Sequence, residues 1–209
     1  MIRRHHKRQK PSVPTWEDWI KNPILCEQSL CYFERQTQVK RLNPHQARDD
    51  VVGHLKKAFH NLSFANQIFD NNQKGLFKLT YTGESFYDWV ITVSYYSMYQ
   101  ASLAALAAVR KVGENHSATV CALIYHYMHK RKRLNERYLV SLDKISNLAN
   151  QDVQKLVEKK LEREKVSYDS GYTTQVGIAQ TALTDAREFV LRIREILEEG
   201  FDKDFLKDV

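Results

Sequence analysis

The chain is poor in residues that break helices. Its 209 residues include only seven glycines and four prolines, and three of the prolines lie within the first 25 positions. Proline interrupts helices and glycine weakens them, so the body of the chain is free to form long helices. We therefore expect an all-α fold.

Cysteine is also scarce. Cys26, Cys31 and Cys121 are an odd number without CxxC spacing, which argues against a disulfide framework and for reduced thiols in a cytoplasmic protein. A zinc site that uses Cys26 and Cys31 with His5 and His6 is the alternative that these residues leave open. The sequence otherwise predicts no metal and no cofactor.

Other signals are missing as well. The sequence has no glycine-rich phosphate loop and no internal repeat, which excludes phosphate-loop enzymes and repeat architectures. Its basic start, MIRRHHKRQK, runs into Pro11 and Pro14 and not into an apolar stretch, so we expect no secretory signal and a cytoplasmic location.

One long uncharged stretch lies between Asp88 and Arg110, in a chain of which 27% is charged. Its length would allow a membrane span of about 20 residues, but serines, tyrosines, Thr92 and Gln100 interrupt the apolar character. We therefore predict a buried central helix and no membrane span. Its buried hydroxyl groups need partners, because an unpaired one costs about 1–3 kcal/mol.

Apolar residues recur at three- and four-residue steps along the rest of the sequence. This spacing predicts further helices at about 44–70, 115–132, 135–149, 151–168 and 174–199. Residues 71–85 are expected to be a loop, Gly113 to stop the central helix in a left-handed conformation, and Asn115 or Ser117 to cap the next helix. The predicted fold is an antiparallel up-and-down bundle of four to six helices.

Four segments follow from these patterns. Residues 1–14 are predicted to be a disordered basic arm, 15–43 an amphipathic extension, 44–199 the helical bundle and 200–209 an acidic tail. The extension is expected to dock on the bundle and to serve as a lid or a partner surface. The residues expected to dock it are Trp16, Trp19, Ile20, Leu25 and Leu30.

The formal net charge of +7 is concentrated in the arm and in a second block, HKRKR, at residues 129–133. Such a positive field attracts polyanions, nucleic acid first among them. We therefore select Lys130, Arg131, Lys132 and Arg133 as candidate nucleic-acid contacts, together with Arg110 and Lys165. A solvated face without a ligand is the alternative, and attachment of the basic arm to a membrane surface is another.

Several segments occur in a characteristic order. SFYDWVITVSYYSMYQASLAALAA is followed by a Gly turn and NHSATVCALI, then by LEREKVSYDSGY and by DAREFVLRIREIL. In this order and spacing, residues 44–199 resemble the HEPN domain, named for higher eukaryotes and prokaryotes nucleotide-binding. The resemblance implies a bundle of four to five helices that is often dimeric and often encoded beside a nucleotidyltransferase.

Many HEPN proteins are metal-independent ribonucleases, and the resemblance implies a site with an arginine and a histidine a few residues apart. Arg163 matches the arginine, whereas Tyr168 stands where the histidine is expected. Proton transfer near neutrality suits histidine, with a pKa of about 6.5, better than tyrosine, with about 10. His116 is the imidazole that would then transfer the proton. Lys165 would line the RNA-binding groove together with Arg163 and Tyr168. Related subfamilies with the R-E-K-x-x-Y form look more like binding or partner modules.

A second arginine and histidine, Arg110 and His116, formally satisfy the same spacing. Their alternative roles are structural: Arg110 would complement the carboxyl end of its own helix and His116 would help to cap the next one. In HEPN proteins paired with a nucleotidyltransferase, a tyrosine near the motif receives a nucleotide, which would here be Tyr168 or Tyr172. The aromatic residues Tyr95, Tyr96 and Tyr99 are expected to lie in the core, with hydroxyl groups at a polar seam near Arg163.

The function expected from these features is RNA or nucleotide binding, with metal-independent ribonuclease activity in a toxin–antitoxin or defence system and a homodimeric assembly. The alternative is a non-catalytic module that partners a nucleotidyltransferase, an antitoxin or another subunit through the Trp16/Trp19 segment. Tight binding of a partner without affinity for RNA would favour the alternative.

Overall fold

A computed structural model describes residues 14–77, 85–162, 176–201 and 206, and for 151–162 it describes the backbone alone. Arg163, Lys165, Tyr168 and Tyr172 therefore lie outside the described residues, as do most of the basic arm and most of the acidic tail. The predictions for these positions stay predictions.

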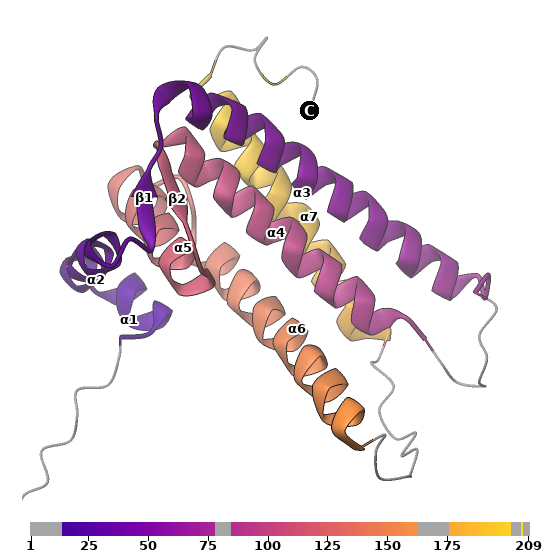
Figure 1. The fold of residues 1–209 in the computed structure, drawn as a ribbon. Helices are drawn as coiled ribbons and strands as arrows, with labels where there is room; N and C mark the ends of the chain where they lie inside the picture. Colours follow the sequence, from indigo (N-terminus) through magenta and orange to yellow (C-terminus); the bar gives the residue numbers. More distant parts are fainter. Residues whose placement is uncertain (1–13, 78–84, 163–175, 202–205, 207–209) are drawn as a thin grey trace, which may run out of the picture.

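Helices make up most of the described chain (Figure 1), which confirms the prediction of an all-α helical bundle. The helices are α1 (Trp16–Lys21), α2 (Pro23–Arg35), α3 (Pro44–Gln73), α4 (Tyr87–Ala108), α5 (His116–Leu123), the π-helix η1 (Ile124–Lys130), α6 (Glu136–Glu162) and α7 (Val176–Glu198). Two short strands, β1 (Val39–Arg41) and β2 (Lys111–Gly113), pair antiparallel, with Val39 opposite Gly113 and Arg41 opposite Lys111.

The central helix is α4, as its uncharged sequence predicts. It contacts α3 along its length and also packs on α5, α6 and α7 (Figure 1). Two of its serines donate to carbonyl oxygens: Ser97 Oγ to Ala58 at 2.7 Å and Ser102 Oγ to Met98 at 2.9 Å. The hydroxyl of Ser94 is buried and has no partner among the described residues. Most of the buried hydroxyl groups thus meet the expected requirement for a partner.

The region between α4 and α5 differs from the prediction. Gly113 does not stop the central helix; it lies in β2, and Arg110 takes the left-handed conformation, with φ of 59°. Gly113 is required for another reason, because a Cβ atom placed on it would lie 2.9 Å from the Cα of Thr119 in α5. The predicted cap at Asn115 is confirmed, since its Oδ1 accepts from the backbone N–H of Ala118 at 2.9 Å.

Two further predictions were wrong in detail. The helices predicted at 135–149 and 151–168 are one continuous helix, α6, up to the last described residue there. The Asn–Gln–Asp sequence at 150–152 contains no glycine or proline, and such residues cost a helix at most about 0.7 kcal/mol each, which is too little to end it. The strands were not predicted, because three-residue segments carry no measurable alternation.

The N-terminal extension docks through the residues expected from its apolar spacing. Trp19, Ile20 and Leu30 are buried, and Trp16 and Leu25 pack partly buried against the same core. Thr15 forms a capping box with Asp18 at the start of α1. Trp19 is therefore part of the core.

None of the helices within the described ranges is both long enough and apolar enough to cross a membrane. Serines and tyrosines lower the hydropathy of α4, the most apolar of the long helices.

The close approach of β2 to α5 leads to a test of stability. We expect Gly113→Ala to lower the free energy of unfolding by about 1–3 kcal/mol, because the added methyl group overlaps the backbone of Thr119. Urea denaturation followed by circular dichroism at 222 nm measures this change.

Gly53→Ala is the matched control. Gly53 lies in the interior of α3 with open space around its Cα, so an added methyl group should raise the free energy of unfolding by about 0.5–1 kcal/mol. Equal effects of the two substitutions would contradict the role assigned to Gly113.

Candidate functional site

Two adjoining hollows lie at the end of the bundle where α4 and α7 end and α3 begins. The larger has a volume of about 540 Å³, and its polar lining comes from Tyr127, Arg131, Arg133 and Glu199. The smaller has a volume of about 390 Å³ and is lined in part by Arg48 and Arg110. Both hollows are also lined by Ala108, Gly200 and Phe201.

The π-helix η1 positions the two arginines of the larger hollow. The buried Tyr127 anchors this segment, because its hydroxyl donates to the carbonyl of Ala105 at 2.5 Å. The backbone N–H groups of Arg133 and Leu134 then return to the carbonyl of Tyr127, at 2.8 and 3.1 Å. The guanidinium of Arg131 lies over the Tyr127 ring, 5.4 Å from its centroid. Tyr127 thus ties the basic block to the core.

Strained backbone occurs at both hollows. Arg110 and Lys132 have φ of 59° and 55°, a conformation that costs a non-glycine residue roughly 1–2 kcal/mol. At Arg110 the strain lets the chain turn from α4 into β2, where the carbonyl of Arg110 accepts from Leu42 N at 2.9 Å and its Nε donates to Leu42 O at 3.3 Å. At Lys132 it turns the chain between Arg131 and Arg133. Such strain is typical of functional sites.

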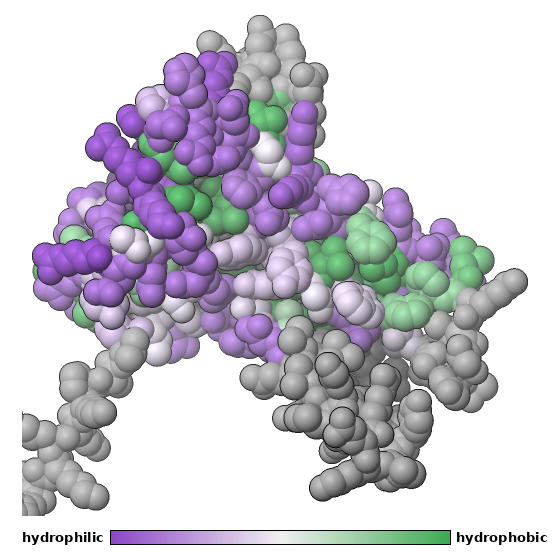
Figure 2. Space-filling model, viewed as in Figure 1, coloured by the Kyte–Doolittle hydropathy of each residue, from purple (hydrophilic) through white to green (hydrophobic). Residues whose placement is uncertain are grey.

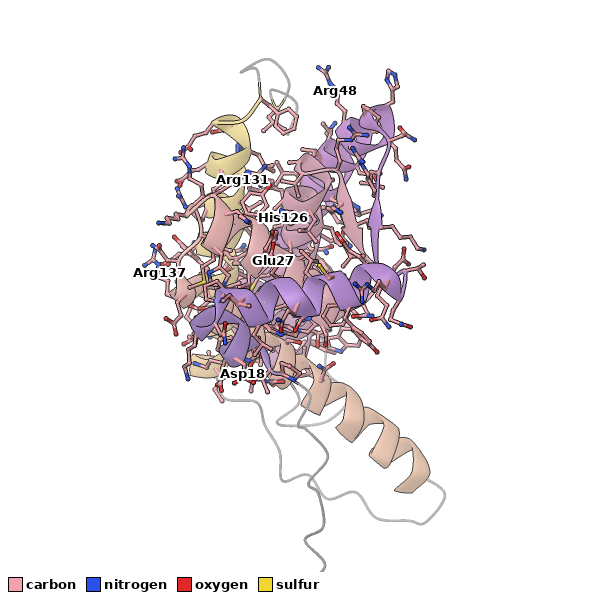
Figure 3. All side chains as sticks on the ribbon, turned by 90° about the vertical axis from the view of Figure 1, so that its left-hand side faces the viewer. Asp18, Glu27, Arg48, His126, Arg131 and Arg137 are labelled. Atoms are coloured by element: carbon pink, nitrogen blue, oxygen red, sulfur yellow. The ribbon has the colours of Figure 1, made fainter. Side chains whose placement is uncertain are left out.

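The charge at this end is predominantly positive. Four arginines from three segments and one glutamate line the two hollows. Arg133 forms a 2.6 Å ion pair with Glu199 at the end of α7. Arg48 and Arg131 lie toward the same end of the molecule, above His126 and α2 in the view of Figure 3. The predicted contacts Arg110, Arg131 and Arg133 are therefore brought together, with Arg48 added.

His126 lies in the same π-helix and is half-buried. Its Nε2 has no hydrogen-bond partner among the described residues. Burial lowers the pKa of His126 to about 4, and the positive charges of Arg131 and Lys111 act in the same direction. The imidazole is therefore neutral at physiological pH.

His116 lies in a different polar group, at the start of α5. Its Nδ1 is 3.1 Å from the hydroxyl of Tyr95, and its ring stacks on that of Tyr99, with centroids 6.4 Å apart. The hydroxyl of Tyr99 is 3.4 Å from Thr119 Oγ1. The prediction that tyrosine hydroxyls of α4 meet at a polar seam thus holds for Tyr95 and Tyr99, whereas Tyr96 is exposed and not in the core.

Asp143 of α6 completes this group. Burial raises the pKa of the Asp143 carboxyl, while the attraction of His116 and a hydrogen bond with Trp16 oppose that rise. Burial likewise lowers the pKa of His116, and Asp143 opposes that shift. An imidazole between a phenol and a carboxyl can accept and donate protons near neutrality. Proton transfer is therefore the chemistry that this group could perform.

The structure does not bring Arg110 and His116 together. They lie beyond opposite ends of β2. His116 stacks on Tyr99, and the distance along α4 from Tyr99 to Arg110 corresponds to roughly 16 Å at about 1.5 Å per residue. The side chain of Arg110 is directed to Leu42. These two residues therefore do not act on one phosphate, and the partner predicted for His116, Arg163, lies outside the described residues.

The described part of the chain contains no group of three or more histidine, cysteine or acidic side chains suited to a metal ion. Of the residues in the alternative zinc site, Cys26 is buried and Cys31 is exposed, while His5 and His6 lie outside the described residues.

Arg48 and Asp143 were missed by the sequence analysis. Arg48 reads as one charge on the polar face of a long helix, and Asp143 as one acid on another. Arg48 lines the same hollow as Arg110, more than 60 positions away along the chain. Asp143 lies beside His116, more than 25 positions away. No local pattern could have identified them, because helix packing alone brings them to their sites.

Comparison with known proteins adds no family: no protein-family model matches the sequence, and no curated protein matches it.

The environment of His126 predicts a pH dependence of stability. The folded pKa of about 4 is lower than the unfolded value of about 6.5, so the unfolded chain binds more protons between these values. Stability from this group is complete above pH 6.5 and declines as the pH falls toward 4. We expect His126→Gln to lose less thermal stability than the wild type between pH 7 and pH 4.5.

Calorimetric melting temperatures at the two pH values measure this difference. The exposed His45 in the first turn of α3 supplies the control: His45→Gln should lose as much stability as the wild type. An unchanged loss in His126→Gln would contradict the assignment.

Proposed function

We propose that this protein is a HEPN-like RNA- or nucleotide-binding protein that holds phosphate groups at the basic end of its bundle. The observation that carries the proposal is the convergence of Arg48, Arg110, Arg131 and Arg133 on two adjoining hollows. Guanidinium groups bind phosphate oxygens in pairs and retain their charge at all physiological pH values.

The size and shape of the hollows support a phosphate-bearing ligand. Their volumes, about 540 and 390 Å³, lie in the range of small-molecule sites. The smaller hollow is lined by Pro44 and Ala47, in the first turns of α3, and the amino end of a helix favours an anion. A nucleotide, or several successive phosphates of an RNA strand, fits this arrangement of charges.

The binding proposal is tested by charge removal. We expect Arg48→Gln together with Arg131→Gln to weaken the binding of a fluorescein-labelled single-stranded RNA about tenfold or more. The slope of log K against log salt should become shallower by roughly 0.7 for each lost phosphate contact. Fluorescence anisotropy over a range of potassium chloride concentrations measures both quantities.

Arg187→Gln is the matched control for each of the two substitutions made singly, because it removes one positive charge elsewhere. Arg187 donates to Asn66 of α3 at 2.5 Å, and Asn66 is about 27 Å along that helix from Arg48. The control should bind RNA as the wild type does. Equal weakening by both variants would indicate a general field effect and would overturn the site.

Ribonuclease activity is the finer part of the function implied by the resemblance. In it His116 transfers the proton and Arg163 stabilises the phosphate, without a metal. A denaturing gel of RNA incubated in EDTA with wild type, His116→Ala and Arg163→Ala tests this step. Cleavage by the wild type that is lost in both variants would support the nuclease. If the wild type binds RNA but leaves it intact, the protein binds RNA without cleaving it.

A second candidate function, a non-catalytic interaction module, is favoured by exposed aromatic side chains. Phe64 of α3 and Trp89 and Tyr96 of α4 are about half exposed, at 49%, 49% and 50%. Figure 2 shows pale and green side chains gathered over the α3 and α4 part of this face. Exposed apolar patches often mark contact surfaces, here for a second copy of the chain or a nucleotidyltransferase subunit. Sedimentation velocity of the wild type beside Trp89→Ser/Tyr96→Ser tests the homodimer.

A further inference from the structure

Two cysteine thiols meet in the core although they are 95 positions apart. Cys26 Sγ lies 3.6 Å from the carbonyl oxygen of Cys121, and Cys121 Sγ lies 3.6 Å from the carbonyl oxygen of Cys26. This reciprocal pattern places the two residues directly opposite each other, on α2 and α5. Both side chains have 0% exposure, and each thiol lies against the backbone carbonyl of the other cysteine.

We propose that Cys26 and Cys121 are a redox pair whose disulfide locks the N-terminal unit α1–α2 to α5. In this step each thiol loses one proton and one electron, and one sulfur–sulfur bond forms. The two electrons and two protons pass to a peroxide, which becomes two waters, or to a small-molecule disulfide, which becomes two thiols. The site is thus a modification site for either class of oxidant.

The bond would add a covalent link to a unit that is already held by apolar packing on the core and by a few polar contacts. Besides the two thiol–carbonyl contacts, Tyr125 donates to Glu27 at 2.7 Å, and His129 Nε2 lies 2.8 Å from the carbonyl of Trp19. Figure 3 shows α2 lying across η1, with Glu27 and His126 near its middle. A disulfide that closes a loop of this length stabilises a fold several times more than one such hydrogen bond does.

The unit that would be locked touches both polar sites. Trp16 of α1 is one of the groups that lower the pKa of Asp143 beside His116, and Lys111, an ion-pair partner of Glu34 in α2, is one of the charges beside His126. A fixed position of α1–α2 therefore holds the surroundings of both histidines in the arrangement described above.

Burial explains how the pair stays reduced until the unit opens. The hydrogen bond with Cys26 and burial together raise the pKa of the Cys121 thiol far above its ordinary value. Because the thiolate is the reactive species, the closed protein reacts slowly with oxidants. When α2 separates from α5, the thiols become accessible to an oxidant. When the two helices pack together again, the disulfide forms and holds the protein in its closed form.

The experiment uses the full chain with Cys31→Ser, because Cys31 is exposed and would form links between molecules. Samples are treated with hydrogen peroxide or oxidised glutathione and compared by intact mass, by peptide mapping under non-reducing conditions and by thermal unfolding. We expect a product two hydrogens lighter, a linked peptide pair containing positions 26 and 121, and a melting temperature higher by about 5–15 °C. Dithiothreitol should reverse all three changes.

Cys26→Ser and Cys121→Ser, each in the Cys31→Ser background, should show none of these changes. To remove the barrier of burial, the same protein is also refolded from guanidinium in a glutathione redox buffer. A protein that remains reduced after both treatments, or a disulfide that lowers the melting temperature, overturns the proposal. RNA plays no part in these measurements, so their outcome is independent of the proposed function.

Discussion

The enclosure of α4 is the constraint on which the rest of the structure depends. This helix has no charge after its first turn and buries side chains on most of its circumference, including a run of alanines that lets neighbouring backbones approach closely. Water cannot cover such a surface without a large loss of hydrophobic free energy. Helices α3, α5, α6 and α7 must therefore surround it, and their order around α4 determines which loops and helix ends meet.

The basic end of the bundle is a consequence of that enclosure. Where α4 and α7 finish, their free carbonyl groups bring partial negative charge to one end of the molecule. Arg110, Arg131 and Arg133 lie at this same end and offset it. Arg48 and the first turns of α3 add positive charge on the other side of the hollows. One set of arginines thus balances the helix ends and remains able to attract phosphate.

The two histidines near the centre have different environments for a related reason. His116 begins α5 and lies between tyrosines of α4 and an acid of α6, so it has partners for proton exchange. His126 is turned inward by the π-helix, with cations around it and no hydrogen-bond partner for Nε2 in the described chain. Burial lowers the pKa of both, but the carboxyl of Asp143 counters the shift at His116 only. The position of α6 therefore gives His116, and not His126, the carboxyl of Asp143 as a neighbour.

The sequence by itself determined the class of fold, the central helix and the docking of the extension, because each depends on apolar spacing that is local to one segment. It also identified the basic block at 129–133, whose charges are adjacent along the chain. The π-helix, the strands, the continuity of α6 and the left-handed turn at Arg110 were decided by tertiary structure, since each depends on contacts that outweigh small local preferences. The same is true of the sites. Arg48 lies near Arg110, Asp143 near His116 and Cys26 near Cys121 only because separate helices pack around α4. The spacing of these residues along the chain does not predict that they meet in space.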